Sequence, residues 1–170
     1  MRNWATRAVG ELAHRRDEIN ALNVFPVPDS DTGSNMAHTM EAAVAELDNG
    51  GDVADSLAFG AVRGARGNSG MVLSQVLRGV AESTVGSVID GDVFVRSLKQ
   101  AVELVDRAIA EPVEGTVITV LKAASESAED AAAQSGATLH SIVSAAIAAA
   151  ETALERTPSQ LPAPVSYTHL

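Results

Sequence analysis

The chain contains no cysteine, which excludes disulfide bonds and metal sites built from thiolates. Only 3% of its 170 residues are aromatic although 46% are hydrophobic, so a core must be built from Ala, Val, Leu and Ile. A chain of this length can form one domain with a substantial core. Because small aliphatic side chains let helices approach closely, this composition favours a compact helical protein.

Basic residues are also scarce, with 12 Lys and Arg against 22 Asp and Glu and a net charge of −10. This balance argues against nucleic-acid binding and against docking on anionic lipid through a basic patch. The negative net charge is still compatible with ATP binding, because one metal ion can reverse the local charge of a site. The sequence has no apolar run of about 18 residues and no apolar N-terminal signal, so we expect a cytoplasmic protein without a membrane span.

The spacing of hydrophobic residues predicts an all-α protein whose helices are separated by breaks rich in Gly, Pro and Asp. The expected helices, about seven in number, cover residues 2–20, 34–48, 53–63, 69–83, 90–110, 116–134 and 138–156. The last of these shows the clearest apolar face, which includes Leu139, Ile142, Ala146 and Leu154. We expect one domain over residues 1–157 and an unstructured, proline-containing tail over residues 158–170.

Two aspartates one residue apart, Asp29 and Asp31, follow a pair of prolines. Carboxylates are hard oxygen ligands suited to Mg²⁺. If the prolines hold the segment extended, alternate side chains point the same way, so both carboxylates can face one pocket. Gly33 permits a turn, and Ser34 and Asn35 would then begin a helix (with Thr32 or Ser34 as its cap) whose free backbone amides suit phosphate. The alternative is a solvated, Asp-rich turn.

Two further breaks place small residues before apolar helices. In Gly67-Asn68-Ser69-Gly70 the glycines would let the backbone approach a phosphate, to which Ser69 can donate. No Gly-Lys-Ser/Thr follows, so this is not a P-loop, and a helix–helix turn with a serine cap is the alternative. The segment Glu114-Gly115-Thr116 is a weaker candidate, since a capped helix start also explains it.

Three segments in this order, residues 20–36, 64–75 and 112–117, resemble the nucleotide-binding (DhaL-type) domain of the dihydroxyacetone kinase L-subunit family. More narrowly, they resemble the branch at the N-terminus of the bacterial fatty acid kinase catalytic subunit. The resemblance covers about residues 1–161 and implies an antiparallel barrel of eight helices, with ATP or ADP and two Mg²⁺ ions at one end.

The resemblance also implies roles for individual residues. Asp29 and Asp31 match metal-binding, catalytic carboxylates, and Asn23 is the nearest counterpart of a third ligand. The positions expected to bind nucleotide are Thr32, Gly33, Ser34, Asn35, Gly67, Asn68, Ser69, Gly70, Gly115 and Thr116. Ser30 stands where a glycine is usual, and Thr32 replaces a histidine of the dihydroxyacetone branch. The family's glycine-rich block and last helix do not follow Pro162, so we expect a C-terminally truncated domain that binds nucleotide poorly.

On this resemblance the parent protein is a magnesium-dependent kinase. It would phosphorylate the carboxylate of a fatty acid presented by a DegV-type fatty-acid-binding protein, giving an acyl phosphate. Two alternatives remain: a non-catalytic helical module that binds nucleotide or a partner, and a dihydroxyacetone kinase L-type subunit. A homodimer formed through regions outside this sequence is also considered.

Overall fold

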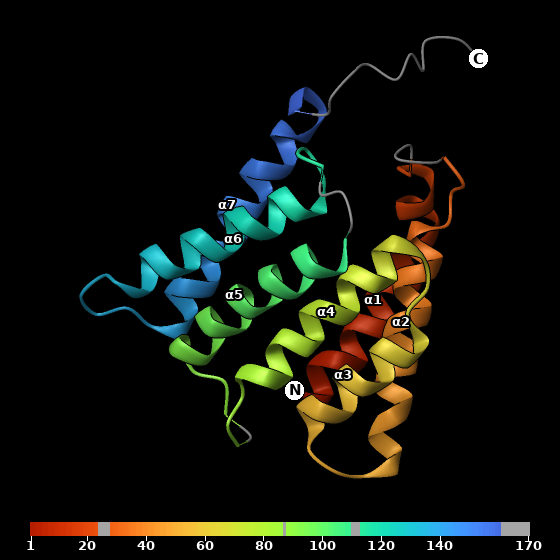
Figure 1. Cartoon of the computed structure of the whole chain (residues 1–170), viewed down its shortest axis with the longest axis horizontal. Coiled ribbons are helices and arrows are strands. Elements are labelled where there is room, and N and C mark those ends of the chain that lie inside the picture. Colours follow the sequence, from red (N-terminus) through yellow and green to blue (C-terminus); the bar gives the residue numbers. More distant parts are fainter. Residues whose placement is uncertain (24–27, 87, 110–112, 161–170) are drawn as a thin grey trace. The chain divides into compact units, whose positions relative to one another are not determined.

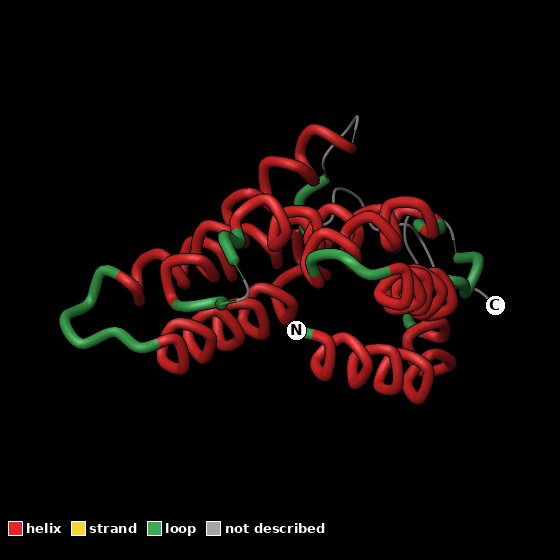
Figure 2. The backbone as a smooth tube through the Cα atoms, turned by 90° about the horizontal axis from the view of Figure 1, so that it is seen from below, coloured by secondary structure: helices red, strands yellow, loops and turns green. Residues whose placement is uncertain are grey.

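The computed structural model describes residues 1–23, 28–86, 88–109 and 113–160. Throughout these ranges the regular structure is helical, without strands (Figures 1 and 2). The elements are α1 (Arg2–Ala21), α2 (Thr32–Glu46), the short 3-10 helix η1 (Leu47–Asn49), α3 (Val53–Gly64), α4 (Gly67–Ser83), α5 (Gly91–Ala108), α6 (Val117–Ala132) and α7 (Leu139–Gln160). The all-α class and the seven predicted helices are therefore confirmed.

Two of the helices begin at aspartates that cap them. The Asp52 carboxylate accepts hydrogen bonds from the backbone N–H groups of Ala54 and Asp55, which stabilises the start of α3. The Asp90 carboxylate accepts from the N–H of Val93 in the same way at the start of α5. Helix α2 differs, because neither Asp31 at its cap position nor Thr32 or Ser34 makes the predicted side-chain cap.

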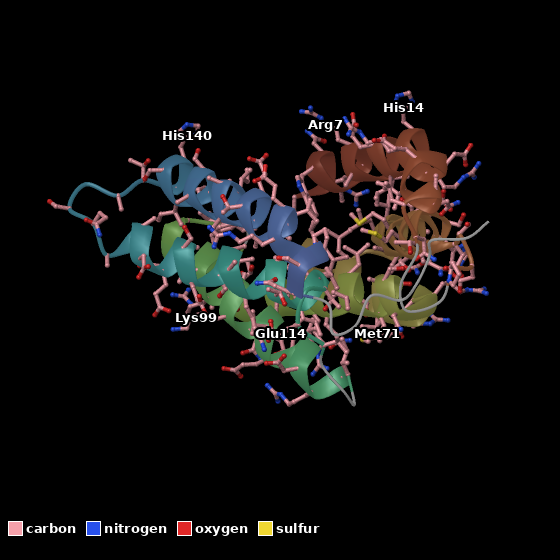
Figure 3. The ribbon with its side chains drawn as sticks, turned by 90° about the horizontal axis from the view of Figure 1, so that it is seen from above. Arg7, His14, Met71, Lys99, Glu114 and His140 are labelled. Carbon is pink, nitrogen blue, oxygen red and sulfur yellow. The ribbon has the colours of Figure 1, made fainter. Side chains whose placement is uncertain are left out.

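The chain divides into two compact units, residues 1–88 and 89–170, which are described separately. In the first unit α2 packs against α1, α3 and α4. Figure 3 shows Arg7 and His14 pointing outward from α1, whose other face joins the core. As the composition predicted, small and aliphatic residues dominate this core, which consists of Ala5, Met40, Ala43, Leu47, Leu57, Ala61 and Leu77.

In the second unit α6 packs against both α5 and α7. The predicted apolar face of α7 is only partly covered within this unit. Ile142 and Ala146 are buried, whereas Leu139 and Leu154, nearer the ends of the helix, are 39% and 61% exposed. The barrel that the resemblance implies stays a prediction, because each unit is described by itself.

Helix α7 continues three residues beyond the predicted domain boundary at 157 and ends at Gln160. Residues 158–160 are therefore helical, contrary to the expected unstructured tail, and residues 161–170 lie outside the described ranges. Pro158 has no N–H for the carbonyl oxygen of Leu154. The hydroxyl of Thr157 donates to that carbonyl instead, at 2.8 Å, which explains how the last turn accommodates a proline. None of the helices in the described part is long and apolar enough to cross a membrane.

Candidate functional site

The first two predicted segments meet in the first unit, where the start of α2 lies against the start of α4. A Cβ atom at Gly67 would lie 2.5 Å from Nδ2 of Asn35, so any larger residue there would displace the Asn35 side chain. Gly67 also has a φ of +58°, a left-handed conformation that favours glycine. The hydroxyl of Ser69 donates to the carbonyl oxygen of Thr32 over 3.5 Å. Residues far apart in the sequence thus form one polar surface.

Thr39 joins these two segments. Its side chain is fully buried, and its hydroxyl donates to the Asn35 carbonyl at 2.7 Å and accepts the Arg66 N–H at 3.3 Å. A Cβ atom at Gly70 would lie 2.4 Å from this hydroxyl, so a larger residue there would push α4 away from α2. Thr39 and Gly70 therefore fix the position of the second segment relative to Asn35.

We expect Thr39→Val to lower the free energy of unfolding by about 1–2 kcal/mol, because the isosteric change removes both hydrogen bonds of the hydroxyl. Urea unfolding followed by circular dichroism measures this loss. Thr39→Ser is the matched control, since it keeps the hydroxyl and loses a methyl group. The expectation is wrong if the valine variant is as stable as the wild type.

The aspartate segment is not extended, so the geometric reason for its two carboxylates to face one pocket is wrong. Ser30 has a φ of +55°, and Asp31 has a φ of −119° and a ψ of −4°, so neither residue is extended. A left-handed φ costs a non-glycine residue roughly 1–2 kcal/mol, which accounts for the glycine usual at this position in the resembling family. The side chain of Asn23 connects the segment, as its Nδ2 donates to Asp29 Oδ1 at 2.7 Å and its Oδ1 accepts the hydroxyl of Thr32.

The backbone amides of Ser34 and Asn35 are not free for phosphate, contrary to the prediction. The Ser34 N–H donates to Oδ1 of Asn20 at 3.1 Å, and Asn20 Nδ2 donates to the Ser34 hydroxyl at 3.0 Å. The Asn35 N–H donates to the carbonyl of Asp31 at 2.8 Å within the helix. Asn20, from the last turn of α1, thus caps the start of α2. Among the described residues, the side-chain amide of Asn35 makes no hydrogen bond and stays available.

The carboxylate oxygens of Asp29 and Asp31 are of the kind that Mg²⁺ prefers, and their role as its ligands stays a prediction. Asp29 is exposed and Asp31 is half-buried, and no basic side chain of the described residues forms an ion pair with either. In the described part of the chain no three Asp, Glu, His or Cys side chains gather as a metal cage. Mg²⁺ is ordinarily held by one or two carboxylates together with substrate phosphates, so two carboxylates suffice. The side chain of Asn23 forms hydrogen bonds with both Asp29 and Thr32, so it is placed to orient Asp29. Its role as a metal ligand stays a prediction.

The third predicted segment belongs to the second unit, at the start of α6. The Gly115 N–H donates to the Thr119 hydroxyl at 3.0 Å, and that hydroxyl donates to Oε2 of Glu114 at 2.7 Å. The hydroxyl of Thr116 donates to the carbonyl of Val113 at 2.7 Å instead of capping the helix. The nucleotide-binding roles of Gly115 and Thr116 stay predictions, because the structure does not place this unit relative to the first.

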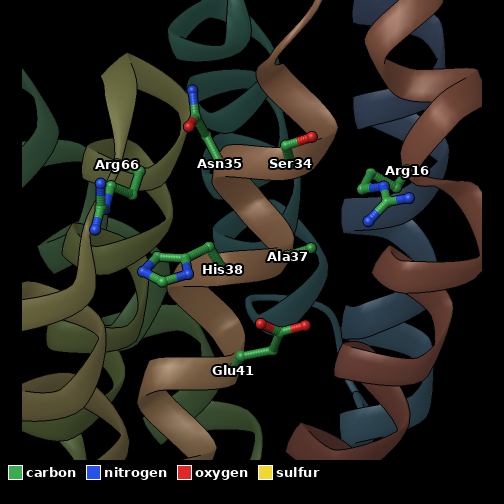
Figure 4. A pocket seen from close by; sticks show the side chains of 7 residues that line it. All are labelled: Arg16, Ser34, Asn35, Ala37, His38, Glu41 and Arg66. Atoms are coloured by element: carbon green, nitrogen blue, oxygen red, sulfur yellow. The ribbon is translucent and has the colours of Figure 1, made fainter.

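A pocket of about 410 Å³ opens on the face of α2 between α1 and the segment that precedes α4 (Figure 4). Its polar lining consists of Arg16, Ser34, Asn35, His38, Glu41 and Arg66. The pocket shares Ser34 and Asn35 with the predicted nucleotide positions but not the two aspartates.

Two residues of this region, Asn20 and Thr39, were missed as functional candidates from the sequence, because they act through contacts with partners distant in the chain. Arg66 was recognised as lying near the second predicted segment but was given no role, although a basic side chain beside a candidate phosphate site is a signal for one.

Comparison with known proteins supports the resemblance. A sequence model described as the DAK2 domain matches residues 26–164, which extends past the domain boundary predicted at 157. Protein YloV of Bacillus subtilis is 38% identical over 157 residues, which are 89% of this chain and 28% of YloV. Uncharacterized proteins of Staphylococcus saprophyticus and Staphylococcus epidermidis are 36% and 37% identical, over 89% and 88% of this chain and 28% of each relative. The chain thus spans about 28% of the length of these curated relatives.

Proposed function

The chain belongs to the DAK2 domain family, and from that premise we propose that it is the ATP-binding domain of a kinase whose acceptor is a fatty acid carboxylate. DAK2 domains belong to the dihydroxyacetone kinase family and bind nucleotide. The observation that carries the proposal is the packing of Gly67 against Asn35 and of Ser69 against Thr32. This packing joins the two segments predicted to bind phosphate and brings the Asn35 side-chain amide close to the start of α4.

The side chains at this junction would position the phosphates of ATP. The hydroxyl of Ser69 is free to turn toward a phosphate, because its present hydrogen bond is long. The Asn35 amide has donors available, and Asn68 is exposed beside it at the start of α4. Asp29 and Asp31 would hold Mg²⁺, which when bound neutralises the phosphates and the charge that develops during transfer.

For the acceptor, we propose a carboxylate presented by a DegV-type fatty-acid-binding protein. One carboxylate oxygen would form a bond with the γ-phosphorus while the bond from that phosphorus to the β–γ bridging oxygen breaks, giving an acyl phosphate and ADP. Because a carboxylate acceptor carries no proton at neutral pH, the reaction needs no general base. The residue at position 32 supports this choice. The dihydroxyacetone branch has a histidine there, whereas this chain has Thr32, whose hydroxyl donates to Asn23.

Two measurements test the proposal. Calorimetry of this chain with ADP should show weak but measurable binding in the presence of Mg²⁺ and loss of binding with EDTA. Turnover of ATP with a fatty-acid-loaded DegV-type protein should give a product that hydroxylamine converts to a hydroxamate, whereas dihydroxyacetone should give none. Absence of Mg²⁺-dependent ADP binding would contradict the proposal and favour a module that only binds a partner. Phosphorylation of dihydroxyacetone instead would favour an L-type subunit.

A further inference from the structure

The pocket on α2 is lined by groups that suit an oxyanion. Of the residues that line the pocket, Asn35, His38 and Arg66 lie on one side of α2 in Figure 4, whereas Arg16 lies across the helix from them. His38 is exposed, and its imidazole can present an N–H donor toward the pocket. These three side chains come from two segments that the buried hydroxyl of Thr39 holds together.

Arg66 differs from its neighbouring arginines in having a free guanidinium. Among the described residues it forms no ion pair, whereas Arg63, three positions earlier, lies 4.0 Å from the Glu46 carboxylate and stacks over the ring of Phe59 at 5.4 Å. Arg16 is paired with Asp17 at 3.2 Å. In a chain with a net charge of −10, a free arginine in a pocket is a favourable partner for an external anion.

We propose that Arg66, His38 and one of the two N–H donors of the Asn35 amide form a subsite for the carboxylate of the acceptor, while the other N–H faces the phosphates of ATP. The inference rests on the proposed function and adds residues that bind the acceptor. The guanidinium can hold both oxygens of a planar carboxylate, while the imidazole and the Asn35 amide donate from the α2 side.

The position of the pocket favours a carboxylate over a nucleotide phosphate. The pocket is not lined by Asp29 or Asp31, beside which metal-bound phosphates would lie, and it extends along α2 to Glu41. The Glu41 carboxylate would repel a polyphosphate more strongly than a group with a single negative charge. Transfer requires the carboxylate oxygen and the γ-phosphorus to approach within about 3–3.5 Å, and the charge of Arg66 offsets the repulsion between these two anions.

Octanoate is the probe for this subsite. In a titration followed by nuclear magnetic resonance, octanoate should shift the Arg66 Nε–H, the His38 ring and the Asn35 side-chain amide signals saturably. Arg66→Gln should weaken octanoate binding about tenfold or more, because it removes a charge-assisted hydrogen-bond pair. Arg63→Gln is the matched control, with the same change of charge three residues away, and should bind octanoate like the wild type.

The proposal is overturned if octanoate causes no saturable shift or if the two glutamine variants bind it equally. A parallel titration with inorganic phosphate and calorimetry with Mg²⁺ and ADP distinguish the acceptor from the nucleotide. If phosphate displaces octanoate and Arg66→Gln also weakens ADP binding tenfold, Arg66 belongs to the nucleotide site and the acceptor assignment is wrong. If the wild type fails to bind ADP, the proposed function fails, while the octanoate titration still reports on the subsite.

Discussion

Asp31→Ala is expected to abolish Mg²⁺-dependent binding of ADP, with a loss of affinity of at least about hundredfold. Removing residues that merely support a metal ligand already costs about 10–100-fold, so removing the ligand itself should cost more. The fold should survive, because the Asp31 side chain makes no cap hydrogen bond to α2. Calorimetry with and without Mg²⁺ measures the affinity, and thermal unfolding verifies that the variant is folded.

Asp55→Ala is the matched control for this change. Asp55 is an exposed aspartate in the first turn of α3, so the variant loses the same charge near a helix start of the same unit. Its affinity for ADP should stay within about twofold of the wild type, since exposed charges beyond a Debye length of about 10 Å are largely screened. A second variant, Asp31→Asn, keeps the size and removes the charge, and it should behave like Asp31→Ala. Unchanged Mg²⁺-dependent affinity in both Asp31 variants would refute the role of this residue.

The secondary structure was largely predictable because it depends on local patterns. Hydrophobic spacing located the helices, and Asp52 and Asp90 caps follow from short-range hydrogen bonds. The predicted end of α7 was wrong because Pro158 was assigned to the unstructured tail. The Thr157 hydroxyl instead donates to the carbonyl oxygen of Leu154, which the proline leaves unpaired.

The interior of the candidate site was less predictable, because its contacts link residues far apart in the chain. The resemblance brought residues 29–35 and 67–70 to one site, and their packing supports that assignment. The capture of the Ser34 amide by Asn20 depends instead on how α1 packs against α2. The left-handed Ser30 departs from what nearby prolines suggest, since a proline restricts its own φ and its predecessor but not a residue two positions later.

Gly60→Ala and Gly10→Ala should change stability in opposite directions, although both replace a glycine inside a helix. Intrinsic helix propensity favours alanine by roughly 0.5–1 kcal/mol at such positions. A Cβ atom at Gly10 would meet nothing within 4 Å, so Gly10→Ala should be stabilising by about this amount. A Cβ atom at Gly60 would lie 2.5 Å from the Ala42 carbonyl oxygen and 2.9 Å from Cα of Ala43, both backbone atoms of α2.

Because backbone atoms cannot move aside as a flexible side chain can, Gly60→Ala must separate α3 from α2. Overpacking of this kind costs about 1–3 kcal/mol, which lowers the melting temperature by several degrees in a chain of this size. The same displacement should weaken Mg²⁺-dependent ADP binding at temperatures where the variant is folded, because α2 carries Asn35 and Thr39, and misplacement by about 1 Å can cost hundredfold in a positioned site. Thermal unfolding and calorimetry on both glycine variants measure the two effects. A stabilised Gly60→Ala with wild-type affinity would show that close packing of α3 on α2 does not position the site.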